Sequence, residues 1–344
     1  MTTFLEDAGR WFLESGIRTP EGGVARFYRS DLASNVPVSS EITGYTVSAL
    51  SYLHALTGDA TYRDAALSSA RFLVNDAWDA KAHTFPFEPR SDKAYFFDIG
   101  IIVRGLVATG SDEFRERAKK AALSLAFDFL GDGSFHPIIA LPDKQPLPYQ
   151  PRWSQTPGCF QLKAALAWLA MDDEQARRMF DVALAFSLAT HESFLDDPDP
   201  ERVMDRLHAY CYFLEALLYV ASREECRAAL AWGIARVSSL LREISPRFER
   251  SDVCAQLLRV RLIAHHLNAA ALDEALARDE ASRIAKYQSR DADPRLKGGF
   301  WFGKKGNEFL PYMNPVSTAF CLQALTLWVQ HQRGAWSLDL GLMI

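Results

Sequence analysis

The stretch 43–78, TGYTVSALSYLHALTGDATYRDAALSSARFLVNDAW, decides the fold class. Its apolar residues recur at intervals of three and four, which is the spacing of one face of an α-helix. In its middle, Gly58 can adopt the left-handed conformation that ends a helix, and Asp59 can cap the start of the next one. The stretch is therefore predicted to form two helices joined by a short turn, that is, a helical hairpin.

The same pattern repeats along the chain, and no convincing run of strict apolar–polar alternation indicates a long strand. The turn chemistry of residues 57–59 returns at 109–112, TGSD. Longer loops rich in proline, glycine and aromatic residues separate one hairpin from the next. Five hairpins are predicted, over residues 43–56 with 61–78, 98–108 with 113–130, 158–170 with 173–190, 205–221 with 223–244, and 252–267 with 272–289.

The two helices of each hairpin differ in composition. First helices are dense in apolar and aromatic residues, as in YFFDIG at 95–100, whereas second helices carry a charged face, as in EFRERAKK at 113–120. First helices are thus expected to form an inner ring and second helices an outer one. Helices at 4–15 and 315–330 remain, and their pairing gives a sixth hairpin that closes the ring. The chain is predicted to be all-α, an (α/α)6 toroid or barrel of six helical hairpins, with residues 1–344 as a single domain.

Composition excludes several classes of protein. The 344 residues carry a net charge of -5, so no global basic field favours nucleic acid as a partner. The most apolar stretch, 95–109, contains Asp98 and Arg104 and is too short for a membrane span. We therefore expect a cytoplasmic protein with no membrane partner. The five cysteines form no CxxC pair and are expected to be reduced and buried: Cys159, Cys211, Cys226, Cys254 and Cys321.

Two segments resemble a known superfamily. LTGDATYRDAA at 56–66 resembles the hairpin turn and outer-helix start of the six-hairpin (α/α)6 superfamily, which contains glycosidases, unsaturated glucuronyl hydrolases, sugar 2-epimerases and polysaccharide lyases. GGFW at 298–301, with NPVSTA at 314–319 and QAL at 323–325, resembles the closing segment of glucuronyl C5-epimerases and, more faintly, the repeats of terpenoid cyclases. The resemblance spans the whole chain and implies a six-hairpin, glycosidase-like fold.

In a ring of this kind, the loops that enter the inner helices converge on the mouth of a central cavity. Cleavage of a glycosidic bond needs one protonated and one ionised carboxyl group. Asp98 and Asp205 are the leading catalytic pair. Three aromatic residues before Asp98 are expected to desolvate it and raise its pKa, whereas Arg206, with His208 nearby, should keep Asp205 ionised.

A structural role competes with the catalytic one at each acid. An aspartate that opens a helix is most often an N-cap, and this applies to both Asp98 and Asp205. Asp252 is expected to cap a helix or to pair with Arg250.

His208 supports a different chemistry. A neutral base with an arginine nearby could abstract the proton alpha to a uronate carboxylate, as in a lyase or C5-epimerase. Arg206, His208 and Tyr210 form the candidate cluster, but residues two apart on a helix diverge by about 200°. The alternative is that His208 and Tyr210 pack structurally in the inner ring.

A sugar site also needs aromatic rings to cover a pyranose and polar groups to bind its hydroxyls. Asn314 has helix capping as its alternative role, and Arg152 and Trp153 have loop packing. His265 and His266 are adjacent and diverge, so no metal site is predicted, and no cofactor motif is present. The predicted substrate-binding residues are Glu41, Tyr45, Arg104, Arg152, Trp153, Arg206, Tyr210, Trp301 and Asn314.

The sequence thus predicts a carbohydrate-active enzyme, first of all a glycoside hydrolase that uses a carboxylate pair on an acidic or modified oligosaccharide. The alternatives are a uronate lyase or C5-epimerase that uses His, Tyr and Arg, and a non-catalytic toroid that binds a glycan or a protein. The expected partner is a small-molecule or oligosaccharide substrate. The oligomeric state stays open, and the proline-rich loop 132–157 is either a lid or a subunit contact.

Overall fold

The computed structural model describes residues 3–171 and 173–344, and they form twelve α-helices that group into two compact units. Unit 1 comprises Met1–Ile17, Phe27–Val36 and Leu195–Ile344, and unit 2 comprises Arg18–Arg26 and Pro37–Phe194. The single-domain organisation stays a prediction.

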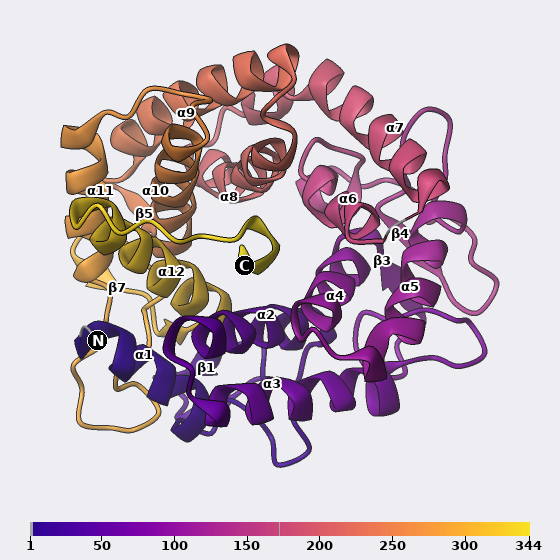
Figure 1. Ribbon diagram of the computed structural model, residues 1–344, viewed down its shortest axis with the longest axis horizontal. Coiled ribbons are helices and arrows are strands. Elements are labelled where there is room, and N and C mark those ends of the chain that lie inside the picture. Colours follow the sequence, from indigo (N-terminus) through magenta and orange to yellow (C-terminus); the bar gives the residue numbers. More distant parts are fainter. Residues whose placement is uncertain (1–2, 172) are drawn as a thin grey trace. The chain divides into compact units, whose positions relative to one another are not determined.

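Unit 2 contains three successive hairpins (Figure 1). Turn chemistry fixes the first of them, because Gly58 has a φ of 72° and its N–H donates to the carbonyl of His54, while Asp59 accepts from the N–H of Thr61. The hairpins pair α2 (Ser40–Thr57) with α3 (Ala60–Phe72), α4 (Phe96–Ala108) with α5 (Arg115–Phe127), and α6 (Gln161–Leu169) with α7 (Glu174–Thr190).

The inner helices of unit 2 approach one another through glycine. A Cβ on Gly100 of α4 would lie 2.4 Å from the Cβ of Ala164 on α6, and one on Gly105 would lie 2.5 Å from the carbonyl oxygen of Gly44 on α2. No side chain fits in either place. The close approach of α2, α4 and α6 therefore depends on these glycines.

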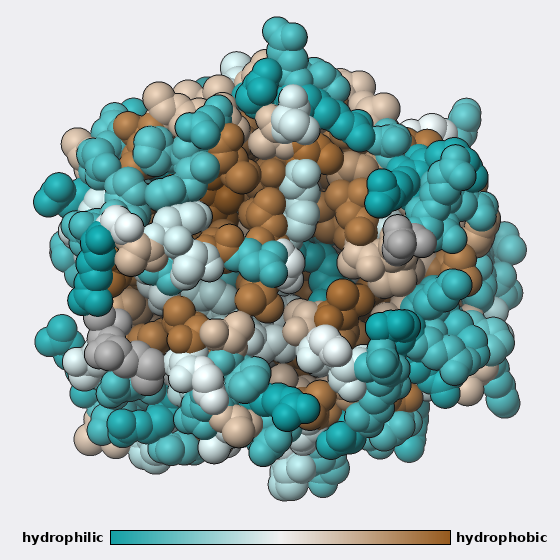
Figure 2. All heavy atoms as spheres, viewed as in Figure 1, coloured by the Kyte–Doolittle hydropathy of each residue, from teal (hydrophilic) through white to brown (hydrophobic). Residues whose placement is uncertain are grey.

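Unit 1 has the same organisation, and most residues of its inner helices are buried. Every residue from Ser251 to Ala264 of α10 is buried, whereas the outer helix α11 buries only Ala277, Glu280, Ala281 and Ile284. In Figure 2 hydrophobic residues gather over the inner helix α8. The helices of unit 1 are α1 (Thr3–Glu14), α8 (Pro200–Leu217), α9 (Glu224–Ile244), α10 (Ser251–His266), α11 (Glu274–Ala285) and α12 (Pro315–Gln332).

The sixth hairpin is confirmed, because α1 packs against α12. The indole N–H of Trp11 on α1 donates to the carbonyl of Arg295 at 2.9 Å, and the Gln288 amide donates to the carbonyl of Phe4 at 2.9 Å. All predicted helices are present, but the helix expected from residue 205 begins at Pro200. Asp199 caps it by accepting from the N–H of Glu201, and the Asp-Pro pair is a helix-start signal.

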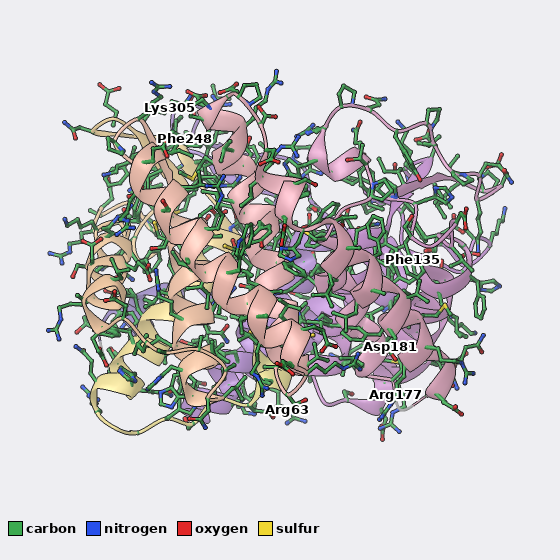
Figure 3. All side chains as sticks on the ribbon, turned by 90° about the horizontal axis from the view of Figure 1, so that it is seen from above. Arg63, Phe135, Arg177, Asp181, Phe248 and Lys305 are labelled. Atoms are coloured by element: carbon green, nitrogen blue, oxygen red, sulfur yellow. The ribbon has the colours of Figure 1, made fainter. Side chains whose placement is uncertain are left out.

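Short strands that the sequence pattern did not predict stabilise the loops before the inner helices. They are β1 (Tyr28–Arg29) between β2 (Ser34–Asn35) and β8 (Tyr312–Met313), β3 (Lys93–Tyr95) with β4 (Ile138–Ala140), and β6 (Gly303–Lys305) between β5 (Phe248–Arg250) and β7 (Glu308–Phe309). Each has only two or three residues, too few for a visible alternation. Figure 3 shows Lys305 beside Phe248 on β6 and β5; its ammonium lies 5.5 Å from the ring centroid.

The remaining sequence predictions on the fold can be checked directly. All five cysteines are free and buried, as predicted. Part of the loop 132–157 is tied down, because Ile138–Ala140 pairs with the strand that leads into α4. Within the described residues, no helix has both the length and the apolar character needed to cross a membrane.

Candidate functional site

Two acids of unit 2 lie in the first turns of neighbouring inner helices. Glu41 is the second residue of α2, and Ser39 caps that helix by accepting from the N–H of Ile42, so the Glu41 carboxylate is not used as the cap. Asp98 is the third residue of α4, whose N-cap Tyr95 makes no side-chain capping bond. Asp98 is therefore not the N-cap of α4, which was the structural role considered for it.

Asp98 is buried, with 6% of its surface exposed, and its Oδ2 has no hydrogen-bond partner among the described residues. Burial raises the pKa of Asp98 well above its usual range, and the nearby Glu41 carboxylate raises it further. Phe97 next to it packs against Phe160, at 6.0 Å between ring centroids. The predicted upward shift of the Asp98 pKa is confirmed.

Glu41 is half-buried, and desolvation raises its pKa to about 7, although Arg26 acts in the opposite direction. The negative charge of Glu41 is also what raises the Asp98 pKa. When two carboxyl groups share a site in this way, one ionises well before the other. The first proton therefore leaves the pair more easily than the second.

Arg26 and the aromatic residues Phe87 and Tyr95 lie around this pair of carboxyl groups. The Arg26 guanidinium bonds Glu88 at 3.0 Å and lies 4.7 Å from the centroid of the Phe87 ring. The Tyr95 ring packs against the Phe87 ring, at 4.8 Å between their centroids. Sequence reasoning missed Arg26; its signal was that it precedes the first inner helix, in the same kind of loop as the other candidates.

The other predicted residues of unit 2 have different environments. Tyr45 is buried one helical turn after Glu41, on the same side of α2. Arg152 is exposed and acts electrostatically on Tyr95, and Trp153 is half-buried with its ring edge-on to Phe160 at 5.1 Å. Arg104 is half-buried six residues after Asp98, a spacing that turns it about 120° away around α4.

In unit 1, His208 lies on α8 in a network that uses both ring nitrogens. Nδ1 donates to the side-chain amide oxygen Oε1 of Gln256 at 2.8 Å, and the Tyr212 hydroxyl donates to Nε2 at 2.8 Å. Burial lowers the His208 pKa to about 4, against the attraction of Asp252. His208 is therefore neutral at physiological pH, and its lone pair is occupied by Tyr212.

Arg250 organises the acids of unit 1. Its Nε and Nη2 bond both oxygens of Asp252, at 3.0 and 2.7 Å, and its Nη1 bonds Asp205 at 2.9 Å. Although burial alone would raise it, Arg250 holds the pKa of Asp252 below its usual value. The predicted Arg250–Asp252 pair is confirmed. Asp205 is half exposed, and its carboxylate accepts a hydrogen bond from Arg250.

Arg206, His208 and Tyr210, the members of the candidate cluster, each contact a different residue, as the helical spacing predicts. Arg206 lies 3.5 Å from Asp197. Tyr210 is fully buried and packs toward the outer helix α9, at 6.4 Å from Trp232. The substrate-binding role of Tyr210 stays a prediction, and its burial agrees with the structural packing that was given as its alternative.

Two candidates near the end of the chain also have structural contacts. The half-buried Trp301 ring stacks on Phe309, at 6.0 Å between centroids. Asn314 caps α12 by accepting from the N–H of Val316 at 2.7 Å, which confirms the alternative role given to it.

Asp98 and Asp205 belong to different units. Within its own unit, Asp98 has Glu41 as its acidic neighbour, and Asp205 has Arg250 as its partner. Within unit 2, the structure thus places the carboxyl groups of Glu41 and Asp98 near each other, while the predicted pairing of Asp98 with Asp205 stays a prediction. Among the described residues, no group of three His, Cys, Asp or Glu is placed to hold a metal ion.

No family model matches the chain, and no curated protein matches it in sequence. Solved structures do. Cellobiose 2-epimerase from Spirochaeta thermophila superposes with a TM-score of 0.69 at 14% identity, over 93% of this chain and 94% of that one. The Bacillus thermoamylovorans cellobiose 2-epimerase gives 0.68 at 12%, over 95% and 100%.

The chain has the six-hairpin (α/α)6 toroid fold. A family 76 glycoside hydrolase from a bovine Bacteroides thetaiotaomicron strain shares this fold with a TM-score of 0.61 at 11% identity, over 96% of this chain and 78% of that one. The six-hairpin toroid predicted from the sequence is thus confirmed, and its structural neighbours include both an epimerase and a hydrolase. At these identities the likeness concerns the fold, so the reaction has to be argued from the site.

Proposed function

We propose that this six-hairpin toroid is a carbohydrate-active enzyme that hydrolyses a glycosidic bond with Glu41 and Asp98. The observation that carries the proposal is that two carboxyl groups with raised pKa lie together in the first turns of α2 and α4. Buried acids with perturbed pKa values are typical of catalytic sites. A buried carboxyl oxygen without a hydrogen-bond partner among the described residues costs stability, which favours a catalytic use of Asp98 over a purely structural one.

The two acids take different roles. Asp98 keeps its proton because it is buried and because the charge of Glu41 raises its pKa, so Asp98 is the general acid that protonates the leaving oxygen. Glu41, with a pKa of about 7, ionises first and acts on water or on the anomeric carbon. This division of labour requires no metal or cofactor.

The surroundings of the pair fit an acidic or modified sugar. Tyr95 and Phe87 offer aromatic surface for the apolar face of a pyranose, and Trp153 offers more at the neighbouring loop. Arg26 and Arg152 supply guanidinium groups, which bind carboxylates with two hydrogen bonds. Support for a sugar also comes from the neighbours in fold, which are named as cellobiose 2-epimerases and a family 76 glycoside hydrolase.

A uronate lyase or C5-epimerase that uses His208 is the second candidate. It is less favoured because the base would need a free ring nitrogen, and both nitrogens of His208 are hydrogen-bonded. The solved epimerases keep epimerisation open as a reaction of the Glu41–Asp98 pair itself, since an acid and a base also suffice to move a proton next to a carbonyl group.

The test is an incubation with neutral and uronic disaccharides, with products followed by NMR. Hydrolysis releases two sugars, and we expect Asp98→Asn and Glu41→Gln each to slow it by about 10²–10⁴-fold. Asp112→Asn, at an exposed acid on the outer side of unit 2, is the control and should keep wild-type turnover. Products in which a sugar carbon has inverted its configuration, with no glycosidic bond cleaved, would show that the reaction is epimerisation and not hydrolysis. Full activity of both variants would refute the proposed site.

A further inference from the structure

Residues 333–344, the tail, turn back along α12 instead of leading away from it. Gly334 has a φ of 62°, and its N–H donates to the carbonyl of His331 at 3.0 Å. The next N–H, of Ala335, donates to the carbonyl of Gln330 at 2.9 Å. These two bonds form a Schellman motif, in which a left-handed glycine ends a helix. The tail is thereby directed back toward residues that come earlier in α12.

One side chain of α12 binds the backbone of the tail. The Gln323 side chain is buried; its Nε2 donates to the carbonyl of Leu342 at 3.0 Å, and its Oε1 accepts from the N–H of Ile344 at 3.2 Å. The two bonds flank Met343, which is buried at 2% exposure, as Ile344 is at 1%. Proteins that bind an extended peptide gain affinity from main-chain bonds of this kind. Gln323 thus holds the tail as a peptide backbone.

A buried ion pair between two inner helices completes the binding of the tail. Arg259 on α10 is fully buried, bonds Glu215 on α8, and lies 4.1 Å from the centroid of the Phe320 ring. Its Nη1 donates to Gln323 at 2.8 Å and to the carbonyl of Ile344 at 3.1 Å. A buried guanidinium needs acceptors to offset its desolvation, and the tail supplies one. Figure 1 shows the end marked C on the side of α10 that faces away from α11.

The tail differs from the inner helices in where its backbone bonds go. An inner helix uses its N–H and carbonyl groups internally. The tail gives its carbonyls at Leu340, Leu342 and Ile344 to side chains of other elements, the first of them to the hydroxyl of Tyr219. Its own internal structure is one short turn, in which Asp339 accepts from the N–H of Gly341 at 2.8 Å. The tail is therefore a self-contained segment that docks on unit 1 as a ligand does.

We infer that residues 339–344 are a plug that leaves as one piece, and that the recess beneath it is a peptide-binding site. The recess is formed by Glu215, Tyr219, Arg259 and Gln323. Its occupant is the chain's own tail, and it selects a short peptide with two free backbone acceptors, one free N–H and apolar side chains at its end. Opening would uncover a guanidinium and an amide. The inference is independent of the reaction proposed for Glu41 and Asp98.

The first experiment opens the plug in the 344-residue chain. Met343→Lys puts an ammonium group in place of a buried thioether, so the tail should leave the recess. Hydrogen exchange followed by mass spectrometry should show the amides of 340–344 exchanging about 30-fold faster than in the wild type, while α10 stays protected. Ala335→Lys adds the same charge at an exposed position of the tail and is the matched control.

Two results of this experiment would overturn the inference. Loss of protection throughout α10 and α12 would show that the tail is part of the core and not a plug. Wild-type protection of 340–344 in Met343→Lys would show that the segment does not open. Unchanged far-ultraviolet circular dichroism checks that the helices of both variants are formed.

The second experiment tests the recess with a fluorescent, acetylated peptide of residues 339–344, DLGLMI. By fluorescence anisotropy it should bind the Met343→Lys chain at least about 10-fold more tightly than the wild type, whose attached tail competes at a high effective concentration. N-methylation at Ile344 removes the N–H that Gln323 accepts and should abolish binding. N-methylation at Leu340, whose N–H opens the turn and has no partner within it, should not. A Met343→Lys chain that binds no peptide, or binds both methylated peptides equally, would refute the peptide site.

Discussion

Asp98 in unit 2 and Asp252 in unit 1 occupy equivalent positions with opposite consequences. Each lies in the first turn of an inner helix and is buried, at 6% and 1% exposure. Asp252 accepts two bonds from Arg250 and one from the N–H of Val253, and its pKa is lowered. Asp98 has an Oδ2 without a partner, and its pKa is raised.

The difference comes from the residue that leads into the helix. Arg250 is the N-cap position of α10, so its guanidinium reaches Asp252 directly. Tyr95 holds the same position before α4 and brings an aromatic ring in place of a charge. Burial without a neighbouring cation raises the pKa of the acid, so the acid tends to keep its proton. A buried acid that is bound to a cation stays ionised. One unit therefore uses its acid to stabilise the fold, and the other keeps its acid ready for proton transfer.

The largest effect should come from breaking the ion pair of unit 1. Arg250→Met leaves the buried Asp252 charge without its partner, so we expect the free energy of unfolding to fall by about 3–5 kcal/mol in urea titrations. Asp98→Asn removes an acid that is expected to carry its proton, so it should change the free energy of unfolding by far less. Equal losses in the two variants would contradict the contrast between the units.

A pH dependence should follow from Glu41. Its pKa rises from the ordinary 4.5 to about 7 on folding, so the folded protein binds a proton that the unfolded chain releases between these values. This contribution to stability is complete below pH 4.5 and is lost as the pH rises through 7, at up to about 1.4 kcal/mol per pH unit. Glu41→Gln should remove that slope from urea titrations at a series of pH values, and the exposed Glu308→Gln should not.

His208 should give a dependence of the opposite sign. Its pKa falls from the ordinary 6.5 to about 4 on folding, so the unfolded chain binds a proton more readily than the folded one. This contribution is present above pH 6.5 and is lost as the pH falls toward 4. His208→Gln should flatten stability in that window, whatever its effect on stability at pH 7. A slope that persists in the variant would assign the titration to another group.

Removal of Arg26 should have the smallest effect of these changes, and it would enlarge the difference in carboxyl pKa between the two units. Arg26 lowers the pKa of both Glu41 and Asp98, so Arg26→Met should move both upward and make unit 2 differ still more from unit 1. NMR titration of the carboxyl carbons measures the shift, which should be small because Arg26 is partly exposed and already paired with Glu88. Arg63→Met, at an exposed arginine of α3, should leave both titrations unchanged.

Helical periodicity was enough to predict the six hairpins because each helix pair repeats the same burial pattern over many residues. The α8 start was misplaced because the apolar run begins only after the polar turn that Pro200 opens. The raised pKa of Asp98 was predictable from the aromatic residues beside it. The pairing of Asp98 with Glu41 was not, because it depends on which inner helices are neighbours, and α2 lies next to α4.

The partners of the charged residues were equally hidden in the sequence. Arg206 stands beside Asp205 in the sequence, but Arg250, the last residue of β5 and 45 residues away, also bonds the Asp205 carboxylate. Adjacent residues on a helix point in different directions, so proximity in sequence misled. The contact of Tyr210 with Trp232 was hidden for a related reason, since a buried inner helix contacts the outer layer as well as the interior.

The division into units also bears on synthesis of the chain by the ribosome. Most of unit 2 is one continuous stretch, whereas unit 1 joins the first residues to those after Phe194. Helix α1, which finally buries Leu5, Trp11 and Phe12, must wait for α12. At about 5–20 residues per second, the roughly 300 intervening residues take about 15–60 s. During that time the apolar face of α1 lacks its partner, so the nascent chain has a defined early segment for a chaperone to shield.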